Sequence, residues 1–190
     1  QDVINKIEEA LAFANSGNLI KNGNFTAEDY APAAPNTDDT QLAKISWLDQ
    51  SWLQVTAIGH SDWRGVRFPV NDYSKIKEMA FYPLLYRMRI RSTVDQELGI
   101  AIHFYDADGK DMGNTLTVDV IHLTANQLLN YKQSFTVTDR VTGAAKIAVL
   151  VYSTNPNSDM GTIIINSVSL EYLYRKNLDS ENLFNSNIYP

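Results

Sequence analysis

From residue 18 onward, apolar and polar positions alternate with a period of two over several runs of strand length. Such alternation, rich in β-branched and aromatic residues, is typical of strands with one buried face. Clusters of Gly, Asn, Asp and Ser separate the runs and predict turns. The predicted strands cover residues 51–58, 84–92, 98–109, 115–123, 131–138, 144–153 and 162–174.

Many short strands with no helical pattern between them predict an all-β fold, an antiparallel jelly-roll β-sandwich. The strongest turn signal is YDADGKDMG, where Asp108-Gly109 supplies the positive φ that a tight hairpin needs. Residues 26–45 lack alternation and predict a long surface loop.

A different pattern occupies the first 15 residues. Ile4, Ile7, Leu11 and Ala14 are spaced by three and four residues, which places them on one stripe of a helix. This short N-terminal α-helix either packs on its own domain or ends a longer helical or coiled-coil stalk. The predicted organisation is a helix or stalk end at 1–16, a β-sandwich at 17–175, and residues 176–190 as a C-terminal tail or the start of a next module.

The last residues resemble an earlier stretch. NLFNSNI at 182–188 echoes NLIKNGNF at 18–25. If the earlier stretch is a first strand, the later one opens a second module; the alternative is an Asn-rich tail that matches by chance.

Alternation also assigns faces to the strands. Tyr86, Met88 and Ile90, with the matching positions of two later strands, are predicted to face the core. The opposite positions are predicted to form one exposed sheet face, either a solvated surface or a functional one. They are Arg87, Arg89, Arg91, Ala101, His103, Tyr105, Ala148, Leu150 and Tyr152.

Charge and composition exclude several classes of partner and of active site. The 190-residue chain has 22 acidic and 16 basic residues, a net charge of −6, so neither nucleic acid nor an anionic membrane surface is an expected partner. No apolar run reaches the roughly 18 residues of a membrane span. The chain has no cysteine, which excludes disulfides, thiolate catalysis and thiolate zinc sites.

Enzymatic activity is not expected. None of the three histidines stands in a metalloprotease spacing, and neither a G-x-S-x-G motif nor a phosphate-binding glycine loop occurs. The carboxylates fall mostly in turns, where they are ordinary turn formers.

Four stretches taken in order resemble the carbohydrate-binding modules of the family 4, 9 and 22 type, over residues 17–174. They are NLIKNGNF as first strand, SWLQVTAIGHSDWRGVRFPV as strand-loop-strand, IAIHFYDADGKDMG in the middle and IIINSVSLEY as last strand. The resemblance implies a jelly-roll sandwich and saccharide binding. Modules of this type accompany secreted glycoside hydrolases, and similar ones occur in bacteriophage tail and baseplate proteins.

The resemblance also points to a binding site. In the family pattern W-x-G-V a tryptophan lines the sugar cleft, and here it is Trp63, whose alternative role is to plug the end of the sandwich. The polar candidates around it are His60, Asp62, Arg64 and Arg67, and the second-tier candidates are Tyr105 and Tyr152. Trp47 and Trp52, five residues apart, are predicted to face differently, with at least one in the core.

Many members of the family hold a structural calcium ion between the first and last strands. Glu28 or Asp29 fills the early acidic position, but the last strand has Asn166 and Ser167 where carboxylates are expected. Calcium therefore stays an open expectation, with ordinary surface acids as the alternative.

These observations predict a non-catalytic saccharide-binding module that binds a polysaccharide of a bacterial cell surface. The expected setting is a phage baseplate or tail protein, located in the virion and joined to other baseplate or tail proteins through the N-terminal helix. Two alternatives stay open: a module appended to a secreted, extracellular glycoside hydrolase, and a structural protein-protein interaction domain that has lost sugar binding.

Overall fold

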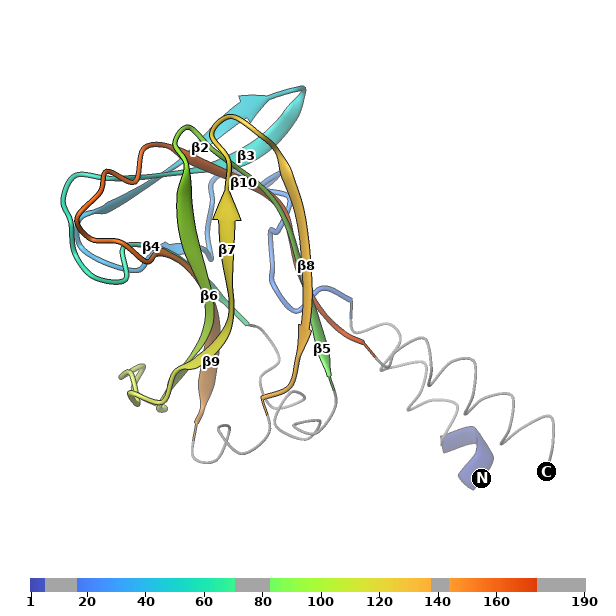
Figure 1. The fold of residues 1–190 in the computed structure, drawn as a ribbon. Helices are drawn as coiled ribbons and strands as arrows, with labels where there is room; N and C mark the ends of the chain where they lie inside the picture. The colour runs from blue at the N-terminus through green and yellow to red at the C-terminus, as the bar shows by residue number, and fades with distance from the viewer. Residues whose placement is uncertain (6–16, 71–82, 138–143, 174–190) are drawn as a thin grey trace.

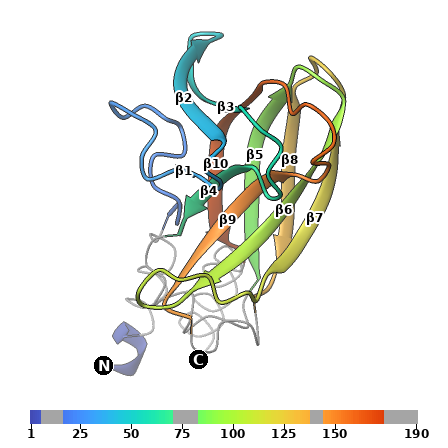
Figure 2. The ribbon, with the colours of Figure 1, turned by 90° about the vertical axis from the view of Figure 1, so that its left-hand side faces the viewer.

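A computed structural model describes residues 1–5, 17–70, 83–137 and 144–173. Within them, ten strands form two antiparallel sheets that face each other (Figures 1 and 2). The strands are β1 (Ala34–Pro35), β2 (Thr40–Trp47), β3 (Gln50–Ala57), β4 (Gly65–Pro69), β5 (Leu84–Ser92), β6 (Gln96–Tyr105), β7 (Leu116–Leu123), β8 (Leu129–Phe135), β9 (Lys146–Ser153) and β10 (Ile163–Tyr172). The predicted all-β sandwich of the jelly-roll type is confirmed.

Strands that follow each other in sequence often lie in different sheets. Sheet A has the order β1-β4-β9-β6-β7, and sheet B has the order β2-β3-β10-β5-β8. The chain crosses from sheet B to sheet A between β5 and β6, which only residues 93–95 separate. The two hairpins β2–β3 and β6–β7 stay within one sheet.

The core lies between the sheets and is built from the inward positions of both. The residues that alternation assigned to the core are buried, as predicted: Tyr86, Met88, Ile90, Ile100, Ile102, Phe104, Ile147, Val149 and Val151. Burial of these apolar side chains is the main driving force for the fold.

The single exposed face predicted from alternation is wrong. Arg87, Arg89 and Arg91 lie on β5 in sheet B, whereas His103 and Tyr152 lie on β6 and β9 in sheet A. Alternation fixes which side of a strand faces outward, but not which sheet the strand joins. The arginines and the imidazole therefore lie on opposite outer sides of the sandwich. Ala101, Ala148 and Leu150, also predicted to be exposed, are buried in a small cluster with Tyr105 and Tyr152 packed against it.

Residues 18–25, predicted as a first strand, form a bend and a turn instead. Asn18 fastens this segment to β10: its Nδ2 donates to the Val168 carbonyl at 2.9 Å, and its Oδ1 accepts from the Leu170 N–H at 2.9 Å. Asn22 and Phe25 adopt positive φ angles of 56° and 54°, which interrupts extended geometry. The segment still contributes three side chains to the core, Leu19, Ile20 and Phe25.

The predicted surface loop at 26–45 is also partly wrong. It contains β1 and most of β2, which pairs along its whole length with β3, from Thr40↔Ala57 to Trp47↔Gln50. Pairing with a neighbouring strand thus overrides the weak local alternation of this stretch.

At the N-terminus, residues 2–5 are helical, as predicted. The rest of the predicted helix, 6–16, and the whole of the predicted tail at 176–190 fall outside the described residues, so the proposed domain boundaries stay predictions. No helix within the described residues has the length and apolar character needed to cross a membrane.

Candidate functional site

The loop between β3 and β4 carries Trp63 onto the outer surface of sheet A, which faces the viewer in Figure 2. Trp63 has a φ of 65°, in the left-handed region that bulky residues rarely adopt. Asn36 holds the backbone there, because its Nδ2 donates to the Trp63 carbonyl at 2.7 Å. The Trp63 side chain stays partly open to solvent, with 38% of the residue exposed.

Two rings from adjacent strands support the indole of Trp63. The centroid of the Tyr152 ring lies 4.3 Å from that of Trp63 at an interplanar angle of 37°, and the His103 ring lies 5.1 Å away at 60°. Tyr152 is on β9 and His103 on β6, which are hydrogen-bonded neighbours. The three rings form an aromatic cluster on the face of the sheet, and Tyr105 extends it, 6.3 Å from His103.

The polar groups beside this cluster come from β4 and the β6–β7 connection. Asp111 places Oδ2 3.4 Å from His103 Nδ1. Burial lowers the pKa of His103; the Asp111 charge opposes this effect, and the Arg67 charge reinforces it. Burial likewise raises the pKa of Tyr105, against the influence of Arg67. At neutral pH the cluster therefore holds a neutral imidazole between one cation and one anion.

His103 has one further feature. The residue is only 7% exposed, and its Nε2 atom is buried without a hydrogen-bond partner among the described residues. Buried polar atoms are normally paired, so an unpaired ring nitrogen beside a candidate site is notable.

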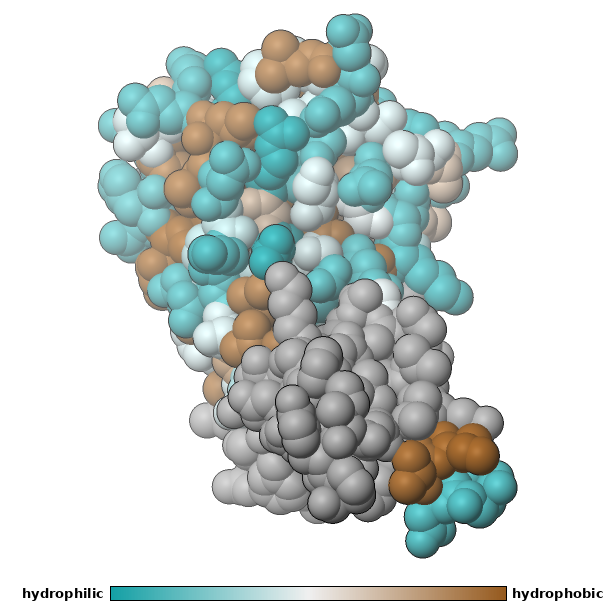
Figure 3. Space-filling model, turned by 90° about the vertical axis from the view of Figure 1, so that its right-hand side faces the viewer, coloured by the Kyte–Doolittle hydropathy of each residue, from teal (hydrophilic) through white to brown (hydrophobic). Residues whose placement is uncertain are grey.

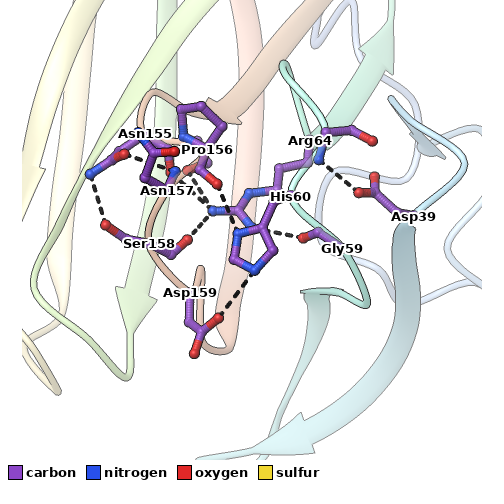
Figure 4. Close-up of polar contacts among 11 residues, drawn as sticks. Asp39, Gly59, His60, Arg64, Asn155, Pro156, Asn157, Ser158 and Asp159 are labelled. Carbon is purple, nitrogen blue, oxygen red and sulfur yellow. Dashed lines mark hydrogen bonds and ion pairs between the residues drawn. The ribbon is translucent and has the colours of Figure 1, made fainter.

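Arg64, predicted as a saccharide ligand, has a different position. It is 1% exposed, and its guanidinium donates to the carbonyls of Gly59 at 2.8 Å and Asn155 at 3.1 Å, and to that of Ser158 (Figure 4). These contacts join the Trp63 loop to the loop after β9. The structure therefore gives Arg64 a positioning role, because both of its Nη atoms are already engaged inside the protein and its Nε is buried, without a hydrogen-bond partner among the described residues.

The other predicted residues of this loop lie at its exposed edge. His60 Nδ1 is 2.8 Å from the Pro156 carbonyl, and its Nε2 is 3.6 Å from Asp159 Oδ1 (Figure 4). Asp62 is exposed next to Trp63. Of the predicted set, the structure brings Trp63, Arg67, Tyr105 and Tyr152 together on sheet A, and leaves His60 and Asp62 at the rim.

Sequence reasoning missed the contribution of Asp39. Its Oδ1 accepts from the Thr37 hydroxyl at 2.5 Å and its Oδ2 from the Ser61 N–H at 2.9 Å, so it ties the start of β2 to the Trp63 loop. These hydrogen bonds, that from Thr37 first, lower the pKa of Asp39 to about 2. No local pattern marks Asp39, because Ser61 in the Trp63 loop is 22 residues away.

Trp47 and Trp52 do not face differently. Both lie on the outer side of sheet B, with ring centroids 5.2 Å apart, and the Trp52 Nε1 donates to the Trp47 carbonyl at 2.8 Å. Trp52 is fully buried there, beneath neighbouring side chains and outside the main core.

Two of the three residues suggested for calcium, Asn166 and Asp29, have protein partners. Asn166 Nδ2 donates to the Ser51 carbonyl at 2.8 Å, Asp29 Oδ1 accepts from the Ala31 N–H at 2.9 Å, and Glu28 is exposed. Within the described residues no three His, Asp or Glu side chains gather as a metal site. The calcium site stays a prediction.

No protein-family model and no curated protein matches the sequence. Solved structures do match the fold. The CBM22-2 xylan-binding domain from Paenibacillus barcinonensis Xyn10C aligns with a TM-score of 0.62 at 9% identity, over 79% of this chain and 97% of that one. The C-terminal family 22 carbohydrate-binding module of Clostridium thermocellum Xyn10B aligns with a TM-score of 0.59 at 10% identity, over 83% and 93%.

A bacteriophage protein is also similar. The enzymatically active domain of tailspike protein 4 from bacteriophage CBA120 aligns with a TM-score of 0.53 at 13% identity, over 82% of this chain and 21% of that chain. The fold is thus that of the family 22 carbohydrate-binding modules, and the resemblance predicted from the sequence is confirmed at the level of the fold.

Proposed function

We propose that this protein is a non-catalytic saccharide-binding module whose site is the aromatic cluster on sheet A. The observation that carries the proposal is Trp63, held over Tyr152 in a strained backbone conformation while 38% of the residue stays exposed. A sugar ring offers a face of C–H groups that packs well on an exposed indole. Backbone strain of this kind persists where the surrounding structure maintains it, often at binding sites.

The polar residues around Trp63 suit sugar hydroxyls. The Arg67 guanidinium donates hydrogen bonds, the Asp111 carboxylate accepts them, and the Tyr105 and Tyr152 hydroxyls do both. Asp111 is half exposed, and both tyrosines and Arg67 are partly exposed, so each is within reach of a ligand on this surface. The likeness to carbohydrate-binding modules supports the same conclusion through the fold alone.

We further infer that the ligand is a polysaccharide of a bacterial cell surface and that the module works outside the cell, on a phage tail or baseplate. The tailspike similarity supports this setting through its fold, and the apolar stripe of the N-terminal segment suits a junction with neighbouring tail proteins. A secreted glycoside hydrolase is the competing setting.

Calorimetric titration tests the proposal. Soluble xylan, β-glucan oligosaccharides and purified wall polysaccharide of a Gram-positive bacterium are titrated into the wild-type chain and into Trp63→Ala. We expect one of them to bind, and Trp63→Ala to weaken the affinity by about tenfold or more. Leu173→Ala, at an exposed apolar residue just beyond β10, is the matched control and keeps wild-type affinity. If none of the saccharides binds the wild-type chain, the function proposed here is wrong.

A further inference from the structure

The outer surface of sheet B carries a row of basic side chains. Arg87, Arg89 and Arg91 alternate along β5 and point away from the core, and Lys132 on β8 pairs directly with Arg87. Figure 3 faces this side of the sandwich, where hydrophilic side chains spread across the middle of the surface. Because the whole chain has a net charge of −6, this row is not a consequence of a basic composition.

Within the described part of the protein these charges form no ion pair. The ion pairs found there involve only His60 and His103, so no carboxylate of the described residues lies within 4.0 Å of the row. Like charges directly opposite on paired strands, as at Arg87 and Lys132, destabilise a sheet. Successive arginines on one face are about 6.8 Å apart along the strand, so their repulsion adds to this cost.

Arg89 is held in place from two sides. Its Cζ lies 5.3 Å from the centroid of the buried Trp52 ring, and its Nη1 donates to Gln50 Oε1 at 2.9 Å. Asn166 Nδ2, at 3.4 Å, contacts the same Gln50 oxygen. A cation over an indole face is stabilised by the ring quadrupole, and here the ring is itself fixed by its hydrogen bond to the Trp47 carbonyl.

Arg91, two residues further along β5, is held in a similar way. Its Cζ lies 5.2 Å from the Trp47 ring centroid, and its Nε donates to the Asn126 carbonyl at 3.3 Å. Each guanidinium has five N–H donors, and the contacts within the described residues use few of them. The two groups are therefore preorganised, charged and still able to donate, which lowers the entropic cost of binding an anion.

We propose that Arg87, Arg89, Arg91 and Lys132 form a second binding surface, for a linear saccharide polymer that carries carboxylate or phosphodiester groups. Guanidinium groups bind both anions with paired hydrogen bonds, and a straight row of cations matches a chain with regularly spaced charges. The exposed neighbours on β8, Asn130 and Ser134, are polar and can form hydrogen bonds with sugar hydroxyls.

This surface lies on the opposite side of the sandwich from Trp63, so both can be occupied at once. Only the choice of a saccharide as the polymer rests on the proposed function. The wild-type chain is titrated with polygalacturonate for carboxylates, with a phosphomannan whose sugars are joined by phosphodiesters, and with neutral xylan. We expect at least one of the two anionic polymers to bind, with an affinity that falls as NaCl rises from about 50 to about 200 mM.

Arg89→Gln/Arg91→Gln is expected to weaken this binding by about tenfold or more. The matched control Lys110→Gln/Lys146→Gln removes two charges elsewhere and keeps wild-type binding. Should Arg89→Gln/Arg91→Gln misfold, Arg89→Lys/Arg91→Lys replaces it, and we expect this variant to retain part of the binding. Trp63→Ala leaves anionic binding unchanged, so failure of the aromatic site and failure of this surface are separable. Equal binding of single-stranded DNA, loss in the Lys110/Lys146 control, or no binding of either anionic polymer would overturn the proposal.

Discussion

The Tyr152 ring lies directly across Gly99 on the neighbouring strand. A Cβ built at Gly99 would come within 2.2 Å of Tyr152 Cζ, so only a glycine leaves room for the ring. The two residues are paired in register between β6 and β9. Tyr152 in turn supports Trp63 at a centroid distance of 4.3 Å. Because Gly99 has no side chain, the rings of the aromatic cluster can lie close to the sheet.

Gly99→Ala is expected to weaken saccharide binding strongly and to lower the stability of the fold only modestly. The clash involves the far end of a side chain, which can rotate away, so the cost in stability is about 1–2 kcal/mol. The displaced Tyr152 no longer supports Trp63, and we expect saccharide affinity to fall by about fivefold or more. Calorimetric titration and tryptophan fluorescence of the variant measure both effects.

The double variant Gly99→Ala/Tyr152→Ala provides the control for this mechanism. Once the ring is removed, the extra methyl group at position 99 has space and its effect on stability disappears. An undiminished penalty in the Tyr152→Ala background would mean that Gly99 matters for another reason.

Arg64→Met is expected to destabilise the protein by about 3–5 kcal/mol, measured by chemical denaturation. The guanidinium satisfies three carbonyls, those of Gly59, Asn155 and Ser158, and its removal leaves them without donors. Arg64→Lys recovers only part of the loss, because one ammonium group cannot reproduce the planar set of donors. Full stability of Arg64→Lys would contradict this role, and Arg67→Lys on the partly exposed sheet face is the comparison variant.

Most strands were predictable from the sequence because each directs apolar residues at alternate positions into the core. The 84–92 run matches β5 residue for residue, and its inward positions Tyr86, Met88 and Ile90 are all in the core. The first strand was not predictable in the same way: residues 18–25 are apolar enough for a strand, but Asn18 and Asn22 fold the backbone into a turn through side-chain hydrogen bonds.

The candidate site was predictable only in its residue types. Trp63, Arg67, Tyr105 and Tyr152 come from three strands and a loop, and their meeting depends on the strand order β4-β9-β6. The positive φ of Trp63 depends on Asn36, 27 residues earlier, which no local pattern indicates. Gly99 within a predicted strand was the one available signal, since a glycine there often marks a close approach.

The β2–β3 hairpin offers a stabilising change. Leu48 and Asp49 form its tip with φ angles of 52° and 58°, which suit Asn-Gly far better, and Leu48 is 61% exposed. We expect Leu48→Asn/Asp49→Gly to raise the free energy of unfolding by about 1 kcal/mol, because the left-handed conformation no longer costs energy. Thermal unfolding measures the gain. Leu48→Ala, which keeps a side chain at positive φ, is the control and lacks that gain.

His103 makes stability depend on pH. Burial lowers its pKa below the ordinary value of 6.5, aided by Arg67 and opposed by Asp111, so the folded protein favours the neutral ring. The stabilisation is complete above the unfolded pKa of 6.5 and is lost as the pH falls through 6.5 toward the lower folded value.

Denaturation at pH values from about 7.5 down to about 5 therefore tests this assignment. The difference in unfolding free energy between the wild type and His103→Gln should shift in favour of the variant as the pH falls. Arg67→Gln removes a charge that lowers the pKa of His103, so the folded pKa moves up toward 6.5 and the total loss of stability on acidification becomes smaller. His122→Gln, an exposed histidine on β7, controls for the removal of a histidine as such. A pH profile of His103→Gln that runs parallel to the wild type would show that this imidazole does not titrate against folding.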